Sequence, residues 1–344
     1  MKSFKEIAKN MQRGPQDAAG LDIGSSDIKV VRMQKREGVI TVSAADILPA
    51  LDLVGVMAET TEAVPAIDLP PRLRARYGCL ALTGESAVVK LLTFPGAFDA
   101  KAEEKVVDNM GLEDASKCRI SYKLLTEGHG RAESRVLCVA LPEAHVRFAP
   151  LLLPSGNPVP FSIEVSGIAA MASFLSSTAA QHKDGSLAAI EFGTHTSTFA
   201  IFNRGILALV RRFAFGAQAV LDKVREKLGV DAETAQGIVA DGSFDISQPL
   251  NEVMDAFVKQ LLVSRDFVER RENCHVGKLY VSGGLAGSAG TIEEMRSSLE
   301  VEVERWDPFE GLQVAKDAIP ERLSAQRWRF AAAVGACLGT FEET

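Results

Sequence analysis

The stretch from Leu21 to Val31, LDIGSSDIKVV, decides the fold. It predicts a strand, a tight polar turn and a second strand. Asp22 ends the first strand, and Gly24 supplies backbone angles that a residue with a Cβ does not readily adopt. Ser25 and Ser26 add N–H groups that can form an anion nest, and a nearby carboxylate can hold a hydrated Mg²⁺. The turn is therefore a candidate phosphate site, although an ordinary hairpin has the same pattern.

A second copy of this pattern lies later in the chain. The run from Ala189 to Ile201, AIEFGTHTSTFAI, again places an acid (Glu191) at the end of an apolar strand, followed by Gly193, hydroxyl residues and another strand. Glu191 lies 169 residues after Asp22 in a chain of 344 residues. A repeat of this length predicts two similar lobes. Two phosphate turns in turn predict a cleft between those lobes.

Composition narrows the class of function. Apolar residues make up 47% of the chain and charged residues 24%, as in globular proteins. The net charge of −7 and the pI of about 5.4 argue against nucleic acid as a ligand. We expect no transmembrane helix and no signal peptide, because no apolar run approaches about 18 residues. The scattered cysteines lack metal-ligand spacing and predict reduced thiols.

Several further elements can be predicted from periodicity. Apolar residues at helical spacing predict a helix from Ala100 to Met110 and a long amphipathic helix from Leu250 to Val268. Thr291 with Glu294 has the spacing of a capping box that opens a helix. In residues 1–19, apolar and basic residues alternate as in an amphipathic helix. This segment is predicted either to pack on its own body or to lie on an acidic membrane surface or a partner.

At this point four segments resemble a known group: GLDIGSSDIKVVRM from Gly20, ALTGESAVVKLLTFPG from Ala81, AAIEFGTHTSTFAIFNRGILALVRRFAFGAQAV from Ala188, and LYVSGGLA from Leu279. Their order resembles the actin, Hsp70 and hexokinase superfamily. Within it they are most similar to the PilM family of type IV pilus assembly, and more distantly to FtsA. The resemblance implies an α/β, actin-like two-lobed fold, with a duplicated ribonuclease H-like core and an inserted α+β subdomain of the FtsA/PilM type.

The resemblance also implies an order of subdomains along the chain. We expect an N-terminal segment, a first lobe in three pieces that is interrupted by the insert (subdomain 1C), and a second lobe that contains subdomain 2B. The expected bounds are 1–19 (N-terminal segment), 20–84 (1A, part), 85–153 (1C), 154–186 (return to the first lobe), 187–220 (2A, part), 221–275 (2B), 276–310 (2A, rest) and 311–344 (C-terminal helix returning to the first lobe).

The resemblance implies ATP or ADP with Mg²⁺ in the cleft. The residues expected to bind the nucleotide are Asp22, Gly24, Ser25, Ser26, Lys29, Gly193, Thr194, Thr196, Gly216, Gly283 and Gly284. Asp22 and Glu191 are expected to hold Mg²⁺ through water. Glu191 is the candidate to orient a hydrolytic water. It stands where the family usually has Asp, and the longer side chain leaves slow hydrolysis an open question.

The implied partner is the N-terminal cytoplasmic tail of a bitopic membrane protein of the PilN type, bound near the insert. With other platform proteins, this tail would place the chain in the cytoplasm, peripheral to the inner membrane of a pilus or a type II secretion system. Two other functions stay open at this stage. One is a small-molecule kinase of the same superfamily, with Asp27 or Glu191 as the base. The other is a degenerate scaffold that binds no nucleotide.

Overall fold

The computed structural model describes residues 15–51, 64–153, 156, 158–241 and 246–342. The amphipathic pattern predicted within residues 1–14 lies outside these ranges. The chain divides into two compact units. Unit 1 consists of Met1–Thr83, Phe148–Ser177 and Asp307–Thr344, and unit 2 consists of Gly84–Arg147 and Thr178–Trp306.

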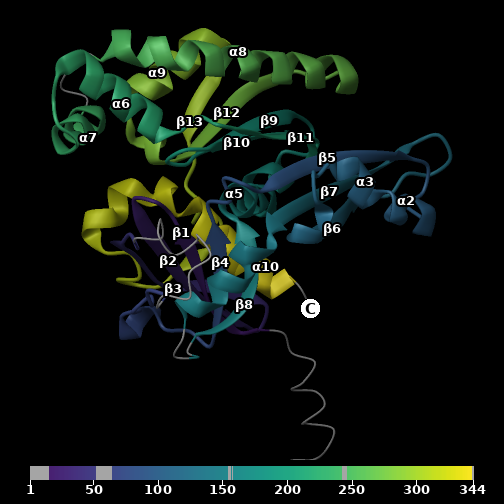
Figure 1. The fold of residues 1–344 in the computed structure, drawn as a ribbon, viewed down its shortest axis with the longest axis horizontal. Coiled ribbons are helices and arrows are strands. Elements are labelled where there is room, and N and C mark those ends of the chain that lie inside the picture. The colour runs from purple at the N-terminus through teal and green to yellow at the C-terminus, as the bar shows by residue number, and fades with distance from the viewer. Residues whose placement is uncertain (1–14, 52–63, 154–155, 157, 242–245, 343–344) are drawn as a thin grey trace, which may run out of the picture. The chain divides into compact units, whose positions relative to one another are not determined.

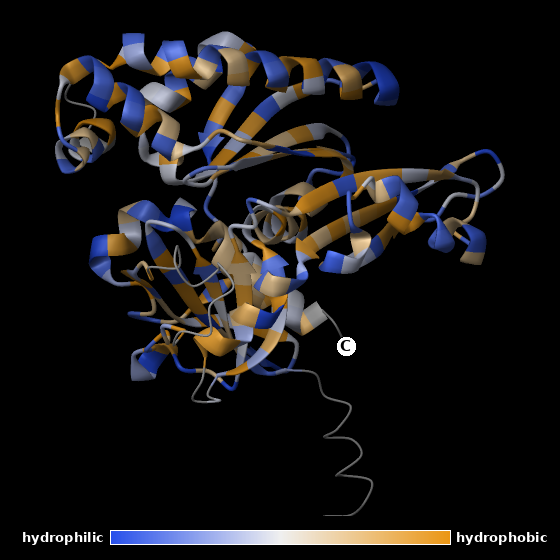
Figure 2. Cartoon of the chain, viewed as in Figure 1, coloured by the Kyte–Doolittle hydropathy of each residue, from blue (hydrophilic) through white to orange (hydrophobic). Residues whose placement is uncertain are grey.

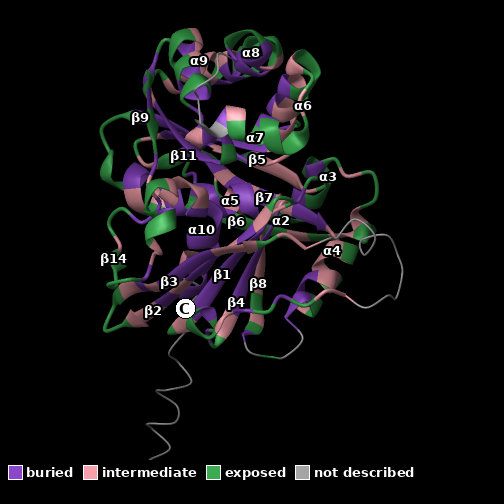
Figure 3. Ribbon diagram, turned by 90° about the vertical axis from the view of Figure 1, so that its left-hand side faces the viewer, coloured by how far each residue is buried: buried purple, intermediate pink, exposed green. Residues whose placement is uncertain are grey.

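A mixed β-sheet forms the centre of unit 1, and within the described residues it has six strands in the order β14-β3-β2-β1-β4-β8. Strands β1, β2 and β3 are antiparallel neighbours, whereas β4 is parallel to β1 and β8 is parallel to β4. The strands are β1 (Asp17–Ile23), β2 (Asp27–Arg36), β3 (Val39–Pro49), β4 (Tyr77–Leu82), β8 (Val159–Val165) and β14 (Gln313–Val314). The central strands of this sheet are largely buried (Figure 3).

Two helices rich in small residues cover one face of this sheet. They are α5 (Ser166–Phe174) and α10 (Ala331–Glu342), which pack on each other, and α10 also packs on β1 and β4. A Cβ built at Gly335 of α10 would lie 1.8 Å from the carbonyl oxygen of Ala169 in α5. Glycine is therefore required at this helix crossing. The 3₁₀ helices η1 (Pro71–Leu73) and η6 (Glu321–Phe330) complete unit 1, and a π-helical turn at Leu175–Ala179 follows α5.

The sheet of unit 2 repeats this strand order. It runs β11-β10-β9-β12-β13 among the described residues, with β9, β10 and β11 antiparallel and with β12 and β13 parallel to β9. The strands are β9 (Ser186–Phe192), β10 (Ser197–Asn203), β11 (Ile206–Phe213), β12 (Val276–Gly283) and β13 (Glu302–Arg305). The order β3-β2-β1-β4-β8 of unit 1 has the same directions, so the predicted duplication is confirmed in topology.

The helices of unit 2 are α6 (Ala217–Leu228), α7 (Ala232–Asp241), α8 (Ser247–Glu272) and α9 (Ala289–Leu299), with a 3₁₀ turn η5 at Gly284–Gly287. The predicted amphipathic helix is α8, in which Met254, Phe257 and Leu261 are buried, and Figure 2 shows polar residues alternating with apolar ones along it. The predicted capping box is wrong. Ser288 caps α9, and its hydroxyl accepts a hydrogen bond from the Thr291 N–H at 3.3 Å, so Thr291 already lies inside the helix.

Residues between β4 and β8 form a small antiparallel sheet, β5-β7-β6, which belongs to unit 2 (Figure 1). We call residues 84–147 the insert. Its elements are β5 (Val88–Pro95), α2 (Ala100–Glu104), α3 (Val106–Met110), η2 (Ala115–Lys117), β6 (Cys118–Thr126), β7 (Glu133–Pro142) and α4 (Glu143–Phe148), and η3 (Ala149–Leu152) follows it. The single helix predicted over 100–110 is wrong, because the Lys105 N–H bonds to the Ala102 carbonyl and tightens the helix there. The subdomain bounds expected from the sequence stay a prediction.

Candidate functional site

The first candidate phosphate turn joins β1 to β2 in unit 1. Ile23 pairs with Ile28, which leaves a loop of residues 24–27. The Gly24 N–H donates to the carbonyl oxygen of Asp27 at 3.1 Å, and a Cβ at Gly24 would lie only 2.7 Å from that oxygen. Only glycine therefore closes this loop so tightly. Ser25 and Ser26 are exposed at its tip, where their N–H groups and hydroxyls are open to a ligand.

Asp22 lies at the base of this turn and is buried. Its Oδ1 accepts a hydrogen bond from the Ser166 hydroxyl at 2.7 Å, and its Oδ2 lies 3.8 Å from Lys29 Nζ. Burial raises the pKa of the Asp22 carboxyl above its ordinary value, and this effect exceeds the opposing attraction of Lys29. A buried carboxylate with so little compensation favours a cation beside it.

Lys29 is held by a second acid in the same turn. Its Nζ lies 2.6 Å from Asp27 Oδ1, and the other carboxylate oxygen of Asp27 contacts the guanidinium of Arg329 in η6. Asp27 therefore lies closer to the ammonium group than Asp22 does, and Asp22 keeps only the 3.8 Å approach of Lys29. A phosphate bound by Lys29 would compete with Asp27 for the ammonium group.

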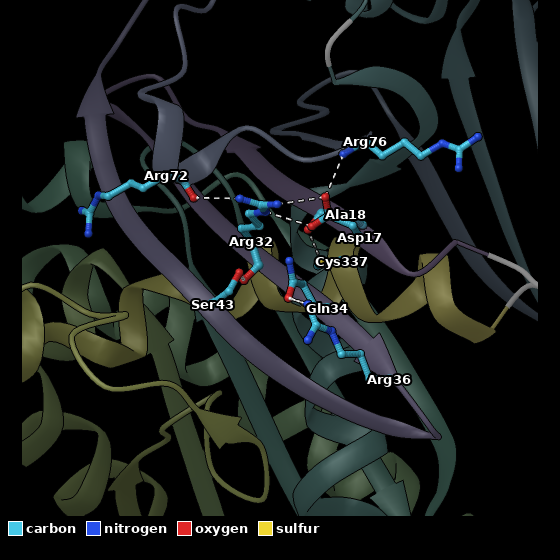
Figure 4. Close-up of polar contacts among 9 residues, drawn as sticks. All are labelled: Asp17, Ala18, Arg32, Gln34, Arg36, Ser43, Arg72, Arg76 and Cys337. Carbon is cyan, nitrogen blue, oxygen red and sulfur yellow. Dashed lines mark hydrogen bonds and ion pairs between the residues drawn. The ribbon is translucent and has the colours of Figure 1, made fainter.

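A bidentate ion pair fixes the far end of the β1–β2 hairpin (Figure 4). Arg32 Nε donates to Asp17 Oδ1 at 2.8 Å, and Nη2 donates to Oδ2 at 3.0 Å. The same carboxylate accepts the Arg76 N–H at 3.2 Å, which ties the start of β4 to β1. A slip of one residue would move every side chain to the other face of the sheet. The pair thus helps to keep Asp22 opposite Lys29.

The second candidate turn joins β9 to β10 in unit 2 and has the same geometry. Phe192 pairs with Ser197, so the loop is residues 193–196. The Gly193 N–H donates to the carbonyl oxygen of Thr196 at 3.0 Å, and a Cβ at Gly193 would lie 2.6 Å from that oxygen. Thr194 and Thr196 are half-buried in the loop. The two hairpins, although distant in sequence, thus have loops of the same length, which are closed by the same backbone hydrogen bond and require glycine at the same position.

Glu191 occupies in β9 the position that Asp22 occupies in β1. It pairs across the ladder with the buried Thr198, which in turn pairs with Arg212 of β11. Burial lowers the pKa of the Arg212 guanidinium, against the attraction of the Glu191 and Glu85 carboxylates. Glu191 therefore has a cationic neighbour, as Asp22 has in Lys29.

The other predicted glycines have structural roles of their own. A Cβ at Gly216 would lie 2.5 Å from the carbonyl oxygens of both Gly193 and Thr194, which accept the first N–H groups of α6. Gly283 has a φ of +81°, and a Cβ there would lie 2.2 Å from the Phe192 oxygen. The nearest atom to a Cβ at Gly284 is 3.8 Å away. Backbone packing thus explains Gly216 and Gly283 without a ligand.

No group of three or more His, Cys, Asp and Glu side chains in the described ranges could hold a metal ion by itself. Mg²⁺ in nucleotide sites takes one or two carboxylates together with phosphate oxygens and water. Asp22 and Glu191 each offer one carboxylate beside a turn of N–H groups and hydroxyls. Such a donor set fits an ion that arrives with a polyphosphate.

Sequence reasoning missed residues that arrive at the turns from distant elements. Ser166 is 144 residues from Asp22, and Arg329 is 302 residues from Asp27. Arg212 falls in the RRFAFG segment that carried the resemblance, but only the ladder register places it near Glu191.

Two sheets of one strand order, each with a glycine-closed hairpin after its first strand, define an actin-like fold. The chain is similar to a solved structure described as the PilM-PilN type IV pilus biogenesis complex, with a TM-score of 0.76 at 19% identity over 94% of this chain and 98% of that chain. The model of the family "Type IV pilus assembly protein PilM" matches residues 161–341, more than half of the 344 residues. The chain belongs to this PilM family, and both the predicted fold class and the resemblance are confirmed.

Other solved structures are less similar. One is a protein of unknown function with an actin-like ATPase fold from Bacteroides thetaiotaomicron, at 8% identity and a TM-score of 0.46 over 90% of this chain and 95% of that chain. Another is MreB 5 of Spiroplasma citri bound to AMPPNP, at 9% identity and a TM-score of 0.46 over 95% and 96%. No curated protein matches the chain significantly. Among the described residues, no helix is both long and apolar enough to cross a bilayer.

Proposed function

We propose that this chain is a nucleotide-binding adaptor of the inner-membrane platform of a type IV pilus or a related type II secretion system. The observation that carries the proposal is the pair of equivalent hairpins, each with a carboxylate at its base, in a member of the PilM family. Nucleotide occupancy would change how the adaptor holds its partner. The geometry of the two turns supports a polyphosphate ligand.

In this proposal both turns hold the same ATP or ADP. Gly24, Ser25, Ser26 and Lys29 contact phosphates from unit 1, and Gly193, Thr194 and Thr196 contact them from unit 2. Gly216, Gly283 and Gly284 border the nucleoside. Asp22 and Glu191 hold waters of Mg²⁺. Where hydrolysis occurs, it is slow and Glu191 orients the water.

The proposed partner is the N-terminal cytoplasmic tail of a PilN-type bitopic membrane protein. It is supported by the similarity to a structure described as a PilM-PilN complex. The tail would bind near the insert and would hold the chain at the cytoplasmic face of the inner membrane, among other platform proteins. The expected subdomain bounds, with 85–153 as subdomain 1C, belong to the same proposal.

Thermal unfolding with ATP, ADP and Mg²⁺ tests the nucleotide role. We expect the melting temperature to rise with millimolar ATP and Mg²⁺ together, because a ligand that binds only the folded state stabilises it. Lys29→Ala should reduce the shift, while Lys259→Ala on the exposed face of α8 serves as the matched control. No shift with any nucleotide would favour the degenerate scaffold.

Two further measurements separate the alternatives. Phosphate release without an added acceptor would exclude an obligate kinase. A synthetic PilN-type tail peptide should bind with an affinity that differs between the ATP and ADP states. Absence of peptide binding in both states would remove the adaptor function while leaving nucleotide binding intact.

A further inference from the structure

The guanidinium of Arg212 in β11 joins the second turn to the insert. Its Nη1 donates to the carbonyl oxygen of Ala87 at 2.7 Å, and its Nη2 lies 3.5 Å from the Thr196 hydroxyl. Ala87 closes a tight turn with Gly84, whose carbonyl accepts the Ala87 N–H at 2.8 Å. This turn leads directly into β5, the first strand of the insert. One side chain therefore contacts a candidate phosphate loop and the base of the insert.

Arg212 also has one acidic neighbour at the second turn and one at the insert. The carboxylates that attract its guanidinium are Glu191, at the base of the turn, and Glu85, at the entrance to the insert. Burial strengthens such interactions, since water screens them less. A change in the charge beside Glu191 therefore changes how strongly the guanidinium is held on the turn side.

A separate set of ion pairs attaches the insert at the other end of β5 and β7. Arg135 of β7 contacts Glu272 at the C-terminus of α8, and the side chains are only 18% and 14% exposed. Arg271 of α8 pairs with Glu133 at 2.8 Å. These contacts do not involve the turn at residues 193–196. Of these two sets of contacts, the one made by Arg212 touches the turn and the ion pairs of Arg135 and Arg271 do not.

The guanidinium is planar, and its donors keep fixed mutual directions. When Nη2 follows a displaced Thr196, Nη1 must move with it, and the bond to the Ala87 carbonyl shifts. Lysine cannot do this, because a single ammonium group has no rigid fork. The mechanical link therefore requires arginine and not only a positive charge.

We propose that Arg212 is the positioning residue that couples occupancy of the second turn to the conformation of the insert at β5. The inference rests on the proposed nucleotide binding and names the residue through which that binding is transmitted. Arg212 itself need not touch the nucleotide. A PilN-type tail bound near the insert would sense the nucleotide through this link.

Hydrogen exchange measured by mass spectrometry on the full chain, with and without ATP and Mg²⁺, tests the coupling. In the wild type we expect exchange of the amides of residues 87–92 to change about fivefold or more on adding ATP and Mg²⁺. Arg212→Lys should bind the nucleotide within about threefold of the wild-type Kd and lose this response, an effect of the size expected for allosteric coupling. Arg212→Gln provides a second, uncharged variant if the lysine variant does not fold.

Arg135→Lys is the matched control, because it weakens the attachment of the insert that does not touch the turn. This variant should raise basal exchange in β7 and should keep the nucleotide response of residues 87–92. If the wild type binds ATP and Mg²⁺ without a change in β5, or if Arg212→Lys keeps the change, the coupling is refuted and nucleotide binding stands. If the wild type does not bind nucleotide, both proposals fall.

Discussion

At the scale of single residues, Asp22 combines features that rarely favour stability. Its carboxyl is buried, one oxygen accepts a single hydroxyl hydrogen bond, and its ammonium neighbour is shared with Asp27. A group that costs folding free energy and faces a polar turn is typical of a site built for a ligand. The same reasoning predicts that its replacement affects stability and binding in opposite directions.

Asp22→Asn keeps the shape of the side chain and the acceptor for Ser166. The raised pKa of Asp22 means that the folded state binds this proton more tightly than the unfolded state does. That contribution to stability is complete below the ordinary pKa of 3.8 and is lost as pH rises through the folded-state pKa. The variant should therefore gain unfolding free energy relative to the wild type as pH rises from 4 to 7, measured by urea titration. Binding of ATP and Mg²⁺ should weaken by about tenfold or more.

Ser166→Ala is the companion variant. It removes the only hydroxyl that is seen to donate to Asp22 among the described residues, so it should destabilise the fold by about 1 kcal/mol. Because this hydrogen bond lowers the pKa of Asp22, its loss should raise that pKa further.

An Asp22→Asn variant that is less stable than the wild type at neutral pH would show that the carboxylate is a structural group.

At the scale of secondary-structure elements, the crossing of α5 and α10 decides how the helices lie on the first sheet. Gly20 of β1 serves the same packing, because a Cβ there would lie 2.0 Å from the Ala333 oxygen of α10. Small residues on both helices allow this close approach. Since Ser166 begins α5, the crossing also places the hydroxyl that meets Asp22.

Gly335→Ala should therefore destabilise unit 1 by about 2 to 3 kcal/mol, since the new methyl group would overlap the Ala169 backbone. Gly237→Ala in α7 is the matched control. A Cβ there meets no atom within 4 Å, so alanine should stabilise the helix by about 0.5–1 kcal/mol. Chemical denaturation of both variants measures the difference. If Gly335→Ala does not lower the free energy of unfolding relative to Gly237→Ala, then α5 and α10 can move apart at little cost in free energy.

The elements also show which features were predictable from the sequence. Apolar strands around an acid-x-glycine turn, repeated at long spacing, predicted both hairpins and two similar lobes, whereas the actin-like fold class came from the resemblance of four segments to a known superfamily. The partners of the acids were not predictable, since Ser166 and Arg329 reach the turns only through tertiary packing. The single helix over 100–110 was mispredicted because a tightened turn at Lys105 divides it into two helices. The cap of α9 was mispredicted because Ser288, and not Thr291, caps this helix.

At the scale of the whole molecule, the metal should depend on the nucleotide. Asp22 and Glu191 each offer one carboxylate at the base of a turn, and no group of three or more ligating side chains in the described residues could hold a metal ion by itself. Mg²⁺ alone should therefore leave the melting temperature unchanged, whereas Mg²⁺ with ATP should raise it more than ATP alone. Calorimetric titration with MgCl₂ checks this directly. Tight binding of Mg²⁺ without nucleotide would require a site that these residues do not form.

The strongest test at this scale asks whether the two turns hold one ligand. Lys29 belongs to unit 1 and Thr194 to unit 2. If both contact one polyphosphate, removing either contact lets the phosphates move away from the other, so the second substitution costs less than it does alone. We expect Lys29→Ala and Thr194→Ala each to raise the Kd of ATP with Mg²⁺ about tenfold, and the double variant to raise it by clearly less than about a hundredfold. Strict additivity would contradict this coupling between the two contacts. An effect of only one substitution would show that the other turn does not contact the ligand.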